Sequence, residues 1–134
     1  MRSVAYVSQA VGQWNDDDFE GLLETSRRRN TDDAISGLLI FCRGYFLQVV
    51  EGADEQVSGL IERIRADQRH SDIEMIYESD IDDRVFPQWS MGFEKVDSET
   101  LVQKVLAPAV DRGLIAPEVV REALIERFLT NQSA

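Results

Sequence analysis

One run of eight residues constrains this chain most, because it has the pattern of a buried β-strand that carries a single amide. Residues 45–52 are rich in aromatic and β-branched side chains and are bounded by Gly44 and Gly52. Alternate side chains of a strand share a face, so Phe46, Gln48 and Val50 point the same way. An unpaired buried amide costs about 1–3 kcal/mol. The sequence therefore predicts a polar partner for Gln48.

Size and charge exclude several classes of protein. With 134 residues, of which 43% are hydrophobic, the chain fits one compact domain. The net charge of −11 argues against binding of nucleic acid as the main task. Cys42 is the only cysteine and His70 the only histidine, so neither an internal disulfide nor a multi-histidine metal site can form. No long apolar segment resembles a signal peptide or membrane helix, so we expect a cytoplasmic protein without membrane contact.

Hydrophobic spacing predicts a ferredoxin-like α+β sandwich with the order βαββαββ. The expected strands are 3–9, 35–42, 45–52, 73–78 and an edge strand at 86–93, with a turn at 69–72. The expected helices run from a cap at Asn15 to about residue 30, and from 54 to 66. Residues 1–96 would form the domain proper. Residues 97–134 would form a two-helix extension, with Pro108 ending its first helix, that covers the free sheet face or a partner.

Several polar residues allow two readings from spacing alone. Tyr6 is either a half-buried strand tyrosine or part of a site, and Asn30 either points inward or caps its helix. Arg63 and Asp67 lie four apart, so they pair with each other or reach into a cleft. The run Arg27-Arg28-Arg29 is most simply a solvated helix end that complements the helix dipole.

Motifs of common enzymes are missing from the chain. It contains no GxxxxGK[ST] phosphate loop, no CxxC pair and no GxSxG nucleophile motif. Fold alone assigns no chemistry. We therefore do not expect an enzyme.

Five spaced motifs resemble the BLUF family of blue-light sensors that use FAD, over about residues 1–96. The motifs are Tyr6-Val7-Ser8; Ser26 and Asn30 ahead of Ile35-Ser36-Gly37-Leu38-Leu39; Phe46-Leu47-Gln48-Val49-Val50-Glu51-Gly52; Arg63-Ile64, Asp67, Arg69 and His70; and Phe86-Pro87, Trp89, Ser90 and Met91. The resemblance implies a flavin held between the two helices on one face of the sheet.

The resemblance also implies roles for single residues. Tyr6 matches the photoactive tyrosine, Gln48 the switching glutamine and Asn30 the asparagine at the pyrimidine edge of the flavin. Ser8 is implied to contact residues of the site rather than the flavin, and Trp89 and Met91 match residues linked to signalling. The remaining implied contacts with the cofactor are Ser26, Arg29, Arg63, Asp67, Arg69 and His70, of which Arg29 departs from the asparagine or histidine common in the family.

The implied mechanism transfers an electron and a proton from Tyr6 to the excited flavin and then rearranges the Gln48 amide. An amide suits this switch, because turning it exchanges its donor and acceptor ends. With no fused effector expected beyond residue 134, the signal would pass to an unidentified partner protein, and we expect a homo-oligomer.

Two other classes remain as alternatives. An acylphosphatase-like hydrolase would use Arg63 and Asn30 for phosphate. A non-photoactive ligand-binding or dimerisation module would hold Tyr6 and Gln48 as a mere buried pair.

Overall fold

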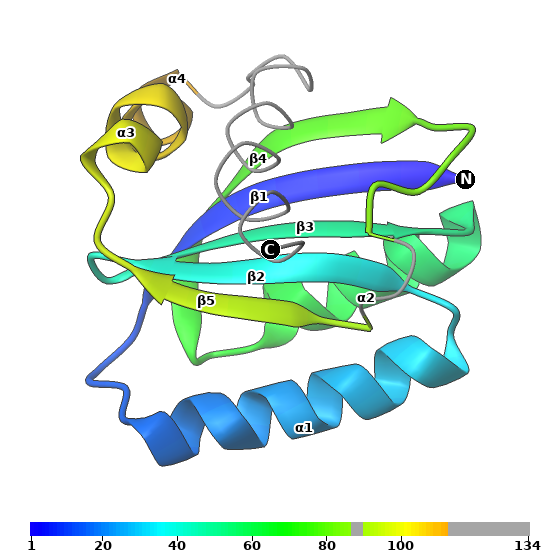
Figure 1. Ribbon diagram of the computed structural model, residues 1–134, viewed down its shortest axis with the longest axis horizontal. Coiled ribbons are helices and arrows are strands. Elements are labelled where there is room, and N and C mark those ends of the chain that lie inside the picture. The colour runs from blue at the N-terminus through cyan, green and yellow to red at the C-terminus, as the bar shows by residue number, and fades with distance from the viewer. Residues whose placement is uncertain (87–89, 113–134) are drawn as a thin grey trace, which may run out of the picture.

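The computed structural model describes residues 1–86 and 90–112, and these form a twisted sheet with helices on both faces (Figure 1). The strands stand in the order β4-β1-β3-β2-β5. All neighbours are antiparallel except β2 and β5, which are parallel. The elements are β1 (Arg2–Ala10), α1 (Asp16–Asp32), β2 (Ser36–Cys42), β3 (Tyr45–Gly52), α2 (Asp54–Ala66), β4 (His70–Asp80), β5 (Gly92–Val96), α3 (Glu99–Leu101), the π-helical turn η1 (Val102–Leu106) and α4 (Ala107–Arg112). The predicted ferredoxin-like α+β architecture is confirmed.

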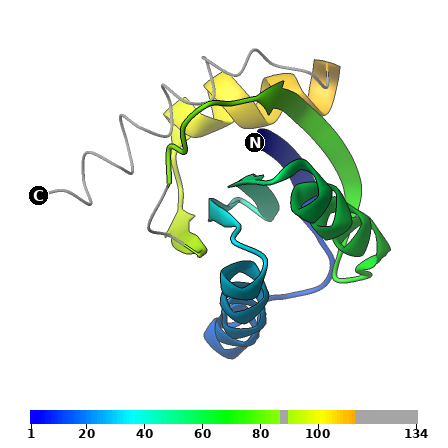
Figure 2. The ribbon, with the colours of Figure 1, turned by 90° about the vertical axis from the view of Figure 1, so that its right-hand side faces the viewer.

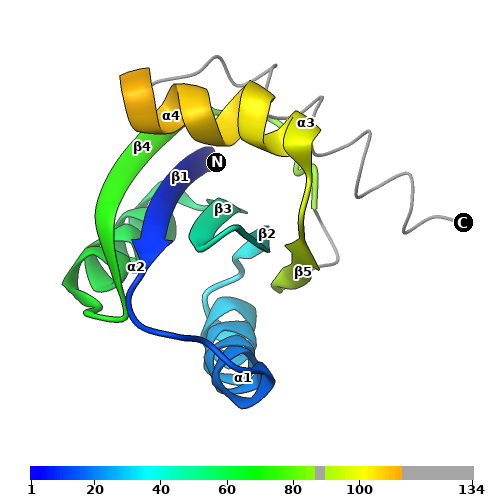
Figure 3. The same ribbon diagram turned by 90° about the vertical axis from the view of Figure 1, so that its left-hand side faces the viewer.

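Two layers of helix sandwich the sheet. Views turned by 90° show α1 and α2 on one face and α3 with α4 across the other (Figures 2 and 3). The alternation predicted for residues 45–52 is present, because Phe46 and Val50 pack toward α1 and α2 while Leu47 and Val49 pack on the opposite side. In the described part of the chain, no helix is both long and apolar enough to cross a membrane.

Local signals in the sequence fix the ends of α1 and the hairpin between β2 and β3. The Asn15 side chain accepts a hydrogen bond from the backbone amide of Asp18 (2.9 Å), and the backbone amide of Asn15 donates to the Asp18 carboxylate (3.0 Å). Together the two bonds form a capping box. The turn residues Arg43 (φ 50°) and Gly44 (φ 83°) both adopt the left-handed conformation that a two-residue hairpin turn requires. Helix α1 extends to Asp32, two residues beyond the predicted end.

The second apolar layer forms where the start of the C-terminal extension packs on the sheet. Its buried side chains are Leu101, Val105, Leu106 and Ala109. They pack with Leu47 and Val49 in the apolar cluster on the face of the sheet opposite α1 and α2. Ser98 caps the segment by accepting a hydrogen bond from the Leu101 amide (3.2 Å). The described part of the extension thus covers the chain's own sheet. The second helix predicted there, from Pro117 onward, lies outside the described residues.

The prediction that Pro108 ends this helix is wrong, because α4 continues to Arg112. The turn before the proline is π-helical, and the Ala107 amide bonds to the Val102 carbonyl five residues back. A proline inside a helix removes one regular hydrogen bond and crowds the preceding turn. The wider π turn relieves that crowding.

Strand β4 differs from its prediction in two ways. It begins at His70 rather than Ile73, so the prediction of a turn at residues 69–72 is wrong. Pairing with β1 continues through this segment because the register shifts opposite Val7 and Gln9, where Asp72 adopts a positive φ (54°). A second register shift, opposite Ala5 and Tyr6, breaks the expected alternation. Tyr77 therefore lies on the same face as Ile76 and not on that of Met75.

The last strand is displaced from its predicted place at 86–93, since β5 spans only 92–96 at the sheet edge. Before β5, the backbone at residues 85 and 86 is bound by a side chain. The Glu51 carboxylate, which is fully buried, accepts hydrogen bonds from the amides of Val85 and Phe86 (both 2.8 Å). Arg84 joins this anchor through the Glu51 carbonyl (3.1 Å).

Candidate functional site

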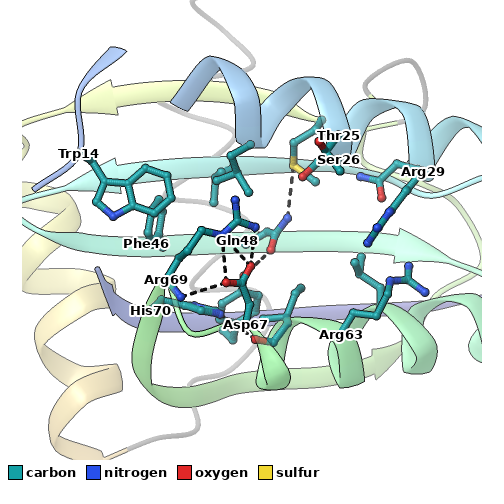
Figure 4. A pocket seen from close by; sticks show the side chains of 17 residues that line it. Trp14, Thr25, Ser26, Arg29, Phe46, Gln48, Arg63, Asp67, Arg69 and His70 are labelled. Atoms are coloured by element: carbon teal, nitrogen blue, oxygen red, sulfur yellow. Dashed lines mark hydrogen bonds and ion pairs between the residues drawn. The ribbon is translucent and has the colours of Figure 1, made fainter. Parts of the chain in front are cut away.

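A cleft of about 780 Å³, counted with its open mouth, lies between α1 and α2 on the sheet. Trp14 and Phe46 lie toward one end, Arg29 and Arg63 toward the other, and Gln48 between them (Figure 4). All residues predicted to contact a cofactor line it: Tyr6, Ser26, Arg29, Asn30, Gln48, Arg63, Asp67, Arg69 and His70.

Tyr6 and Gln48 form the floor of the cleft, because β1 and β3 pair them directly opposite each other. Both are buried, with 4% and 6% of their surface exposed. The Tyr6 hydroxyl donates to Gln48 Oε1 at 2.5 Å, and Gln48 Nε2 donates to Met91 Sδ at 3.5 Å. No other described residue bonds to this amide nitrogen, so it keeps donor capacity toward the cleft.

The phenol of Tyr6 is held in its protonated form. Burial raises its pKa well above the ordinary value of 10.0, and the carboxylate of Asp67 raises it further. At neutral pH, Tyr6 is therefore a hydrogen-bond donor that retains its proton until another group accepts it.

His70 connects the cleft to Ser8, which lies behind it. The ring contacts the Ser8 hydroxyl through Nδ1 (2.7 Å) and the Ile64 carbonyl through Nε2 (2.8 Å). A carbonyl only accepts, so Nε2 must carry the hydrogen. In the neutral ring, Nδ1 then accepts from Ser8, which fixes the orientation of the imidazole beside Tyr6, at 6.1 Å between ring centroids.

Of the two readings of Arg63 and Asp67, the structure supports the one that places them in a cleft, because both residues line it. The alternative, a pair between the two residues, is wrong. Helix α2 ends at Ala66 and the backbone of Asp67 is extended, so the two side chains are not stacked on one helix face. Arg63 instead pairs with Asp33 (3.4 Å). The Asp67 carboxylate accepts from Arg69 Nε (2.9 Å) and Nη2 (2.5 Å), and this pairing holds the pKa of Asp67 below its usual range.

Asn30 points into the cleft rather than capping α1. It is 1% exposed and its Nδ2 donates to the Ser90 carbonyl at 2.6 Å. Its Oδ1 forms no hydrogen bond with a described residue. Of the predicted signalling residues, Met91 contacts Gln48 as described, while Trp89 lies outside the described residues.

Trp14 is a cleft residue that the sequence did not reveal, since it precedes the helix cap in an irregular segment. It packs against Phe46 (5.2 Å between centroids) and Phe19 (5.3 Å). Only its size among small and polar neighbours could have marked it.

The lining as a whole fits a flat heteroaromatic ligand with a polar edge. Apolar walls come from side chains such as Leu22, Leu60 and Ile64, and the buried amides of Asn30 and Gln48 keep unused bonding groups. Arginines at the rim can receive phosphate. The described residues contain no cluster of three or more side chains able to hold a metal ion.

Comparison with known proteins points to one family. Residues 1–92 match the family model described as BLUF, sensors of blue-light using FAD. The chain is 33% identical over 92 residues to the photoactivated adenylate cyclase subunit beta of Euglena gracilis, which is 68% of this chain and 11% of that protein. It is 32% identical over 132 residues to the subunit alpha from the same organism, which is 96% of this chain and 13% of that protein.

Solved structures of BLUF proteins resemble this fold. The dark-state structure of BlrB, a BLUF protein, superposes with a TM-score of 0.73 at 29% identity and covers 91% of this chain and 90% of its own. BlsA in its photo-activated state gives a TM-score of 0.76 at 27% identity, with 93% and 92% covered. The chain thus spans most of these two proteins but only about a tenth of the cyclase subunits.

Proposed function

Because this chain belongs to the BLUF family of blue-light sensors, we propose that Tyr6, Gln48 and an FAD in the cleft form its light-driven switch. The observation that carries the proposal is the Tyr6–Gln48 hydrogen bond on the floor of an open cleft, which is lined by all the predicted cofactor contacts. Among the described residues only Met91 accepts from the Gln48 amide nitrogen, so this nitrogen keeps a second donor. The family is one of sensors, which agrees with the expectation that the chain is not an enzyme.

A bound flavin would supply the absorption of blue light and would accept an electron and a proton. Tyr6 is suited to give both, since its buried phenol stays protonated. Gln48 accepts from Tyr6 through Oε1 and donates through Nε2. Rotation or tautomerisation of this amide exchanges donor and acceptor, so the contacts on both of its sides reverse without net chemistry.

Further polar groups of the cleft support the binding of FAD. Asn30 and Ser26 of α1 both line the cleft, and Oδ1 of Asn30 forms no hydrogen bond with a described residue. Arg29 and Arg63 lie at one end of the cleft, and Asp67, Arg69 and His70 also line it, as candidate contacts of the ring carbonyls, the ribityl chain and phosphate. A phosphate at Arg63 or Arg69 would compete with the partly exposed ion pairs that these arginines form with Asp33 and Asp67. Mass spectrometry of the cofactor released from the purified protein separates FAD from the shorter FMN.

The signal would leave the cleft through Met91 and reach the far face of the sheet. Met91 contacts Gln48 and leads directly into β5, which is followed by the helices on that far face. We propose that residues 1–96 are the flavin-binding domain and that residues 97–134 are the extension that contacts an effector protein. We further propose a homo-oligomer in the cytoplasm; the single cysteine suits a reducing compartment.

The hydrolase alternative loses support from the contacts of its two candidate residues. Arg63 pairs with Asp33 and Asn30 binds the Ser90 carbonyl, so they do not converge on one anion site. The family match also disfavours it.

The decisive experiment is a light-minus-dark absorption spectrum of the protein purified with its flavin. We expect a structured flavin band in the blue and a small red shift under illumination that reverses in the dark. A protein that takes up no flavin on reconstitution, or a flavin-loaded protein without the shift, would refute the proposal.

A further inference from the structure

Two side chains of α1 bind consecutive backbone carbonyls just before β5. Arg27 Nε donates to the Met91 carbonyl at 3.0 Å, and Asn30 Nδ2 donates to the Ser90 carbonyl at 2.6 Å. Residues three apart lie on one side of a helix, so both donors face the same segment. Pairing of β5 with β2 starts only at Gly92. Side chains of α1, rather than the sheet, therefore hold residues 90 and 91.

The Arg27 contact belongs to a chain of contacts that ends at the phenol on the cleft floor. Met91, which is 2% exposed, receives Arg27 at its carbonyl and the Gln48 amide at its sulfur. Gln48 in turn accepts from Tyr6. A thioether is a weak acceptor on a flexible side chain, whereas a hydrogen bond from a guanidinium is charge-assisted. The Arg27 bond is therefore the stronger of the two restraints on Met91.

We propose that Arg27 is a positioning residue: its guanidinium holds the Met91 carbonyl so that the Met91 sulfur stays against the Gln48 amide. When Gln48 reorients, the sulfur loses its donor, and the bond from Arg27 becomes the polar restraint that keeps Met91 in place. This second step rests on the proposed function. The positioning in the dark rests on the geometry alone.

The two arginines that follow Arg27 make different contacts. The run Arg27-Arg28-Arg29 is therefore not simply a solvated helix end, as the sequence suggested. Arg28 pairs with Glu24 (3.7 Å) on the exposed side of α1, and Arg29 lines the cleft. Successive residues of a helix point about 100° apart, which explains the three directions. Arg28 therefore provides a matched control, since both positions are exposed and helical and alanine preserves the helix at either one.

The chain's three methionines allow a direct measurement of this positioning. Hydrogen peroxide transfers one oxygen to a thioether, which becomes a sulfoxide, and is itself reduced to water. Peptide mass spectrometry then gives a rate for each methionine in the full-length, flavin-loaded protein kept in the dark. Met1 is 44% exposed, Met75 is partly buried and Met91 is buried, so Met91 should react slowest in the wild type.

In Arg27→Ala, we expect Met91 to oxidise about three- to tenfold faster, which is the range expected for loss of one hydrogen bond. The rates of Met1 and Met75 should not change, and Arg28→Ala should behave as the wild type. An unchanged Met91 rate in Arg27→Ala overturns the positioning role. Equal acceleration in Arg28→Ala, or acceleration of Met75 as well, shows general loosening and also overturns it.

The half-life of the light-induced spectrum tests the link to the switch. Without Arg27, Met91 leaves its place more readily after Gln48 reorients, and it must return before the dark arrangement re-forms. We expect recovery to slow about threefold in Arg27→Ala and to stay unchanged in Arg28→Ala; an unchanged or faster recovery in Arg27→Ala overturns the link. A wild type without any light-induced shift refutes the proposed function, while the oxidation rates still decide the role of Arg27.

Discussion

Replacing Tyr6 with phenylalanine removes the hydroxyl that donates a hydrogen bond from β1 to the Gln48 side chain. The ring keeps its volume, so no cavity forms, but Gln48 Oε1 loses the donor 2.5 Å away. We expect the light-induced red shift to disappear, because phenylalanine has no phenolic proton to give. Flavin should remain bound, since the other polar groups of the cleft are untouched.

The effect on stability can be worked out from the burial of the partner. Gln48 is 6% exposed, and no other described residue donates to its oxygen. A buried acceptor left without a donor costs about 1–3 kcal/mol. Urea denaturation of the flavin-free protein should show a loss of this size, and Tyr45→Phe, on a half-buried tyrosine of β3, is the control.

The same variant changes the dependence of stability on pH. In the unfolded wild-type chain Tyr6 ionises near its ordinary pKa of about 10, while burial keeps the folded phenol protonated to higher pH. Above pH 10 the unfolded state therefore binds fewer protons than the folded state. The contribution of Tyr6 to stability is complete below pH 10 and falls by about 1.4 kcal/mol for each further pH unit.

Tyr6→Phe should lack this decline while keeping the contributions of the other tyrosines. Two results would refute the reasoning. A normal red shift in Tyr6→Phe would exclude the phenol as the photoactive group. An identical fall of stability above pH 10 in the variant and the wild type would show that the phenol ionises freely in the folded protein.

Three further predictions concern the switch, the anchor and the extension. Gln48→Leu should retain flavin and lose the red shift in the light-minus-dark spectrum, whereas a normal shift would exclude the amide. Glu51→Gln should lower the free energy of unfolding by about 1–3 kcal/mol, since an amide cannot accept with both ends from the two backbone amides. The control Glu62→Gln, at an exposed position in the interior of α2, should leave the free energy of unfolding unchanged, and equal denaturation midpoints of Glu51→Gln and the wild type would count against the anchor. Truncation after Val96 should preserve the photochemistry but uncover apolar sheet surface, so that light scattering detects aggregation or a changed oligomer; unchanged mass and solubility would show that the extension does not cover the sheet.

Periodicity predicted the parts of the fold in which one rule acts alone. The bounds of α2 agree with the structure, and so do the Asn15 cap and the alternation around Gln48. Errors occur where two constraints compete. The bulges of β4 and the displaced β5 depend on contacts with residues far away in the chain. The π turn arises where continuation of the helix competes with the missing amide and the crowding of Pro108.

Most of the polar residues that line the cleft followed from the resemblance, but the ion pairs of its charged residues did not. Spacing allowed a pair between Arg63 and Asp67. Because α2 ends at Ala66, Arg63 instead pairs with Asp33 and Asp67 pairs with Arg69. Trp14 carried no periodic signal, because an aromatic residue in an irregular segment acquires its position only from the elements around it.

By itself, the sequence determined that a buried amide at position 48 needs a partner, because strand periodicity and the cost of desolvation are local properties. The family resemblance implied Tyr6 as one partner of this amide, and the structure shows the hydrogen bond between them. Tertiary structure alone decided that the Met91 sulfur accepts from the other end of the amide and that Arg27 reaches the Met91 carbonyl from α1. These contacts join residues 42, 43 and 64 positions apart. Strand pairing and helix packing bring such distant residues together, and no local pattern in the sequence records them.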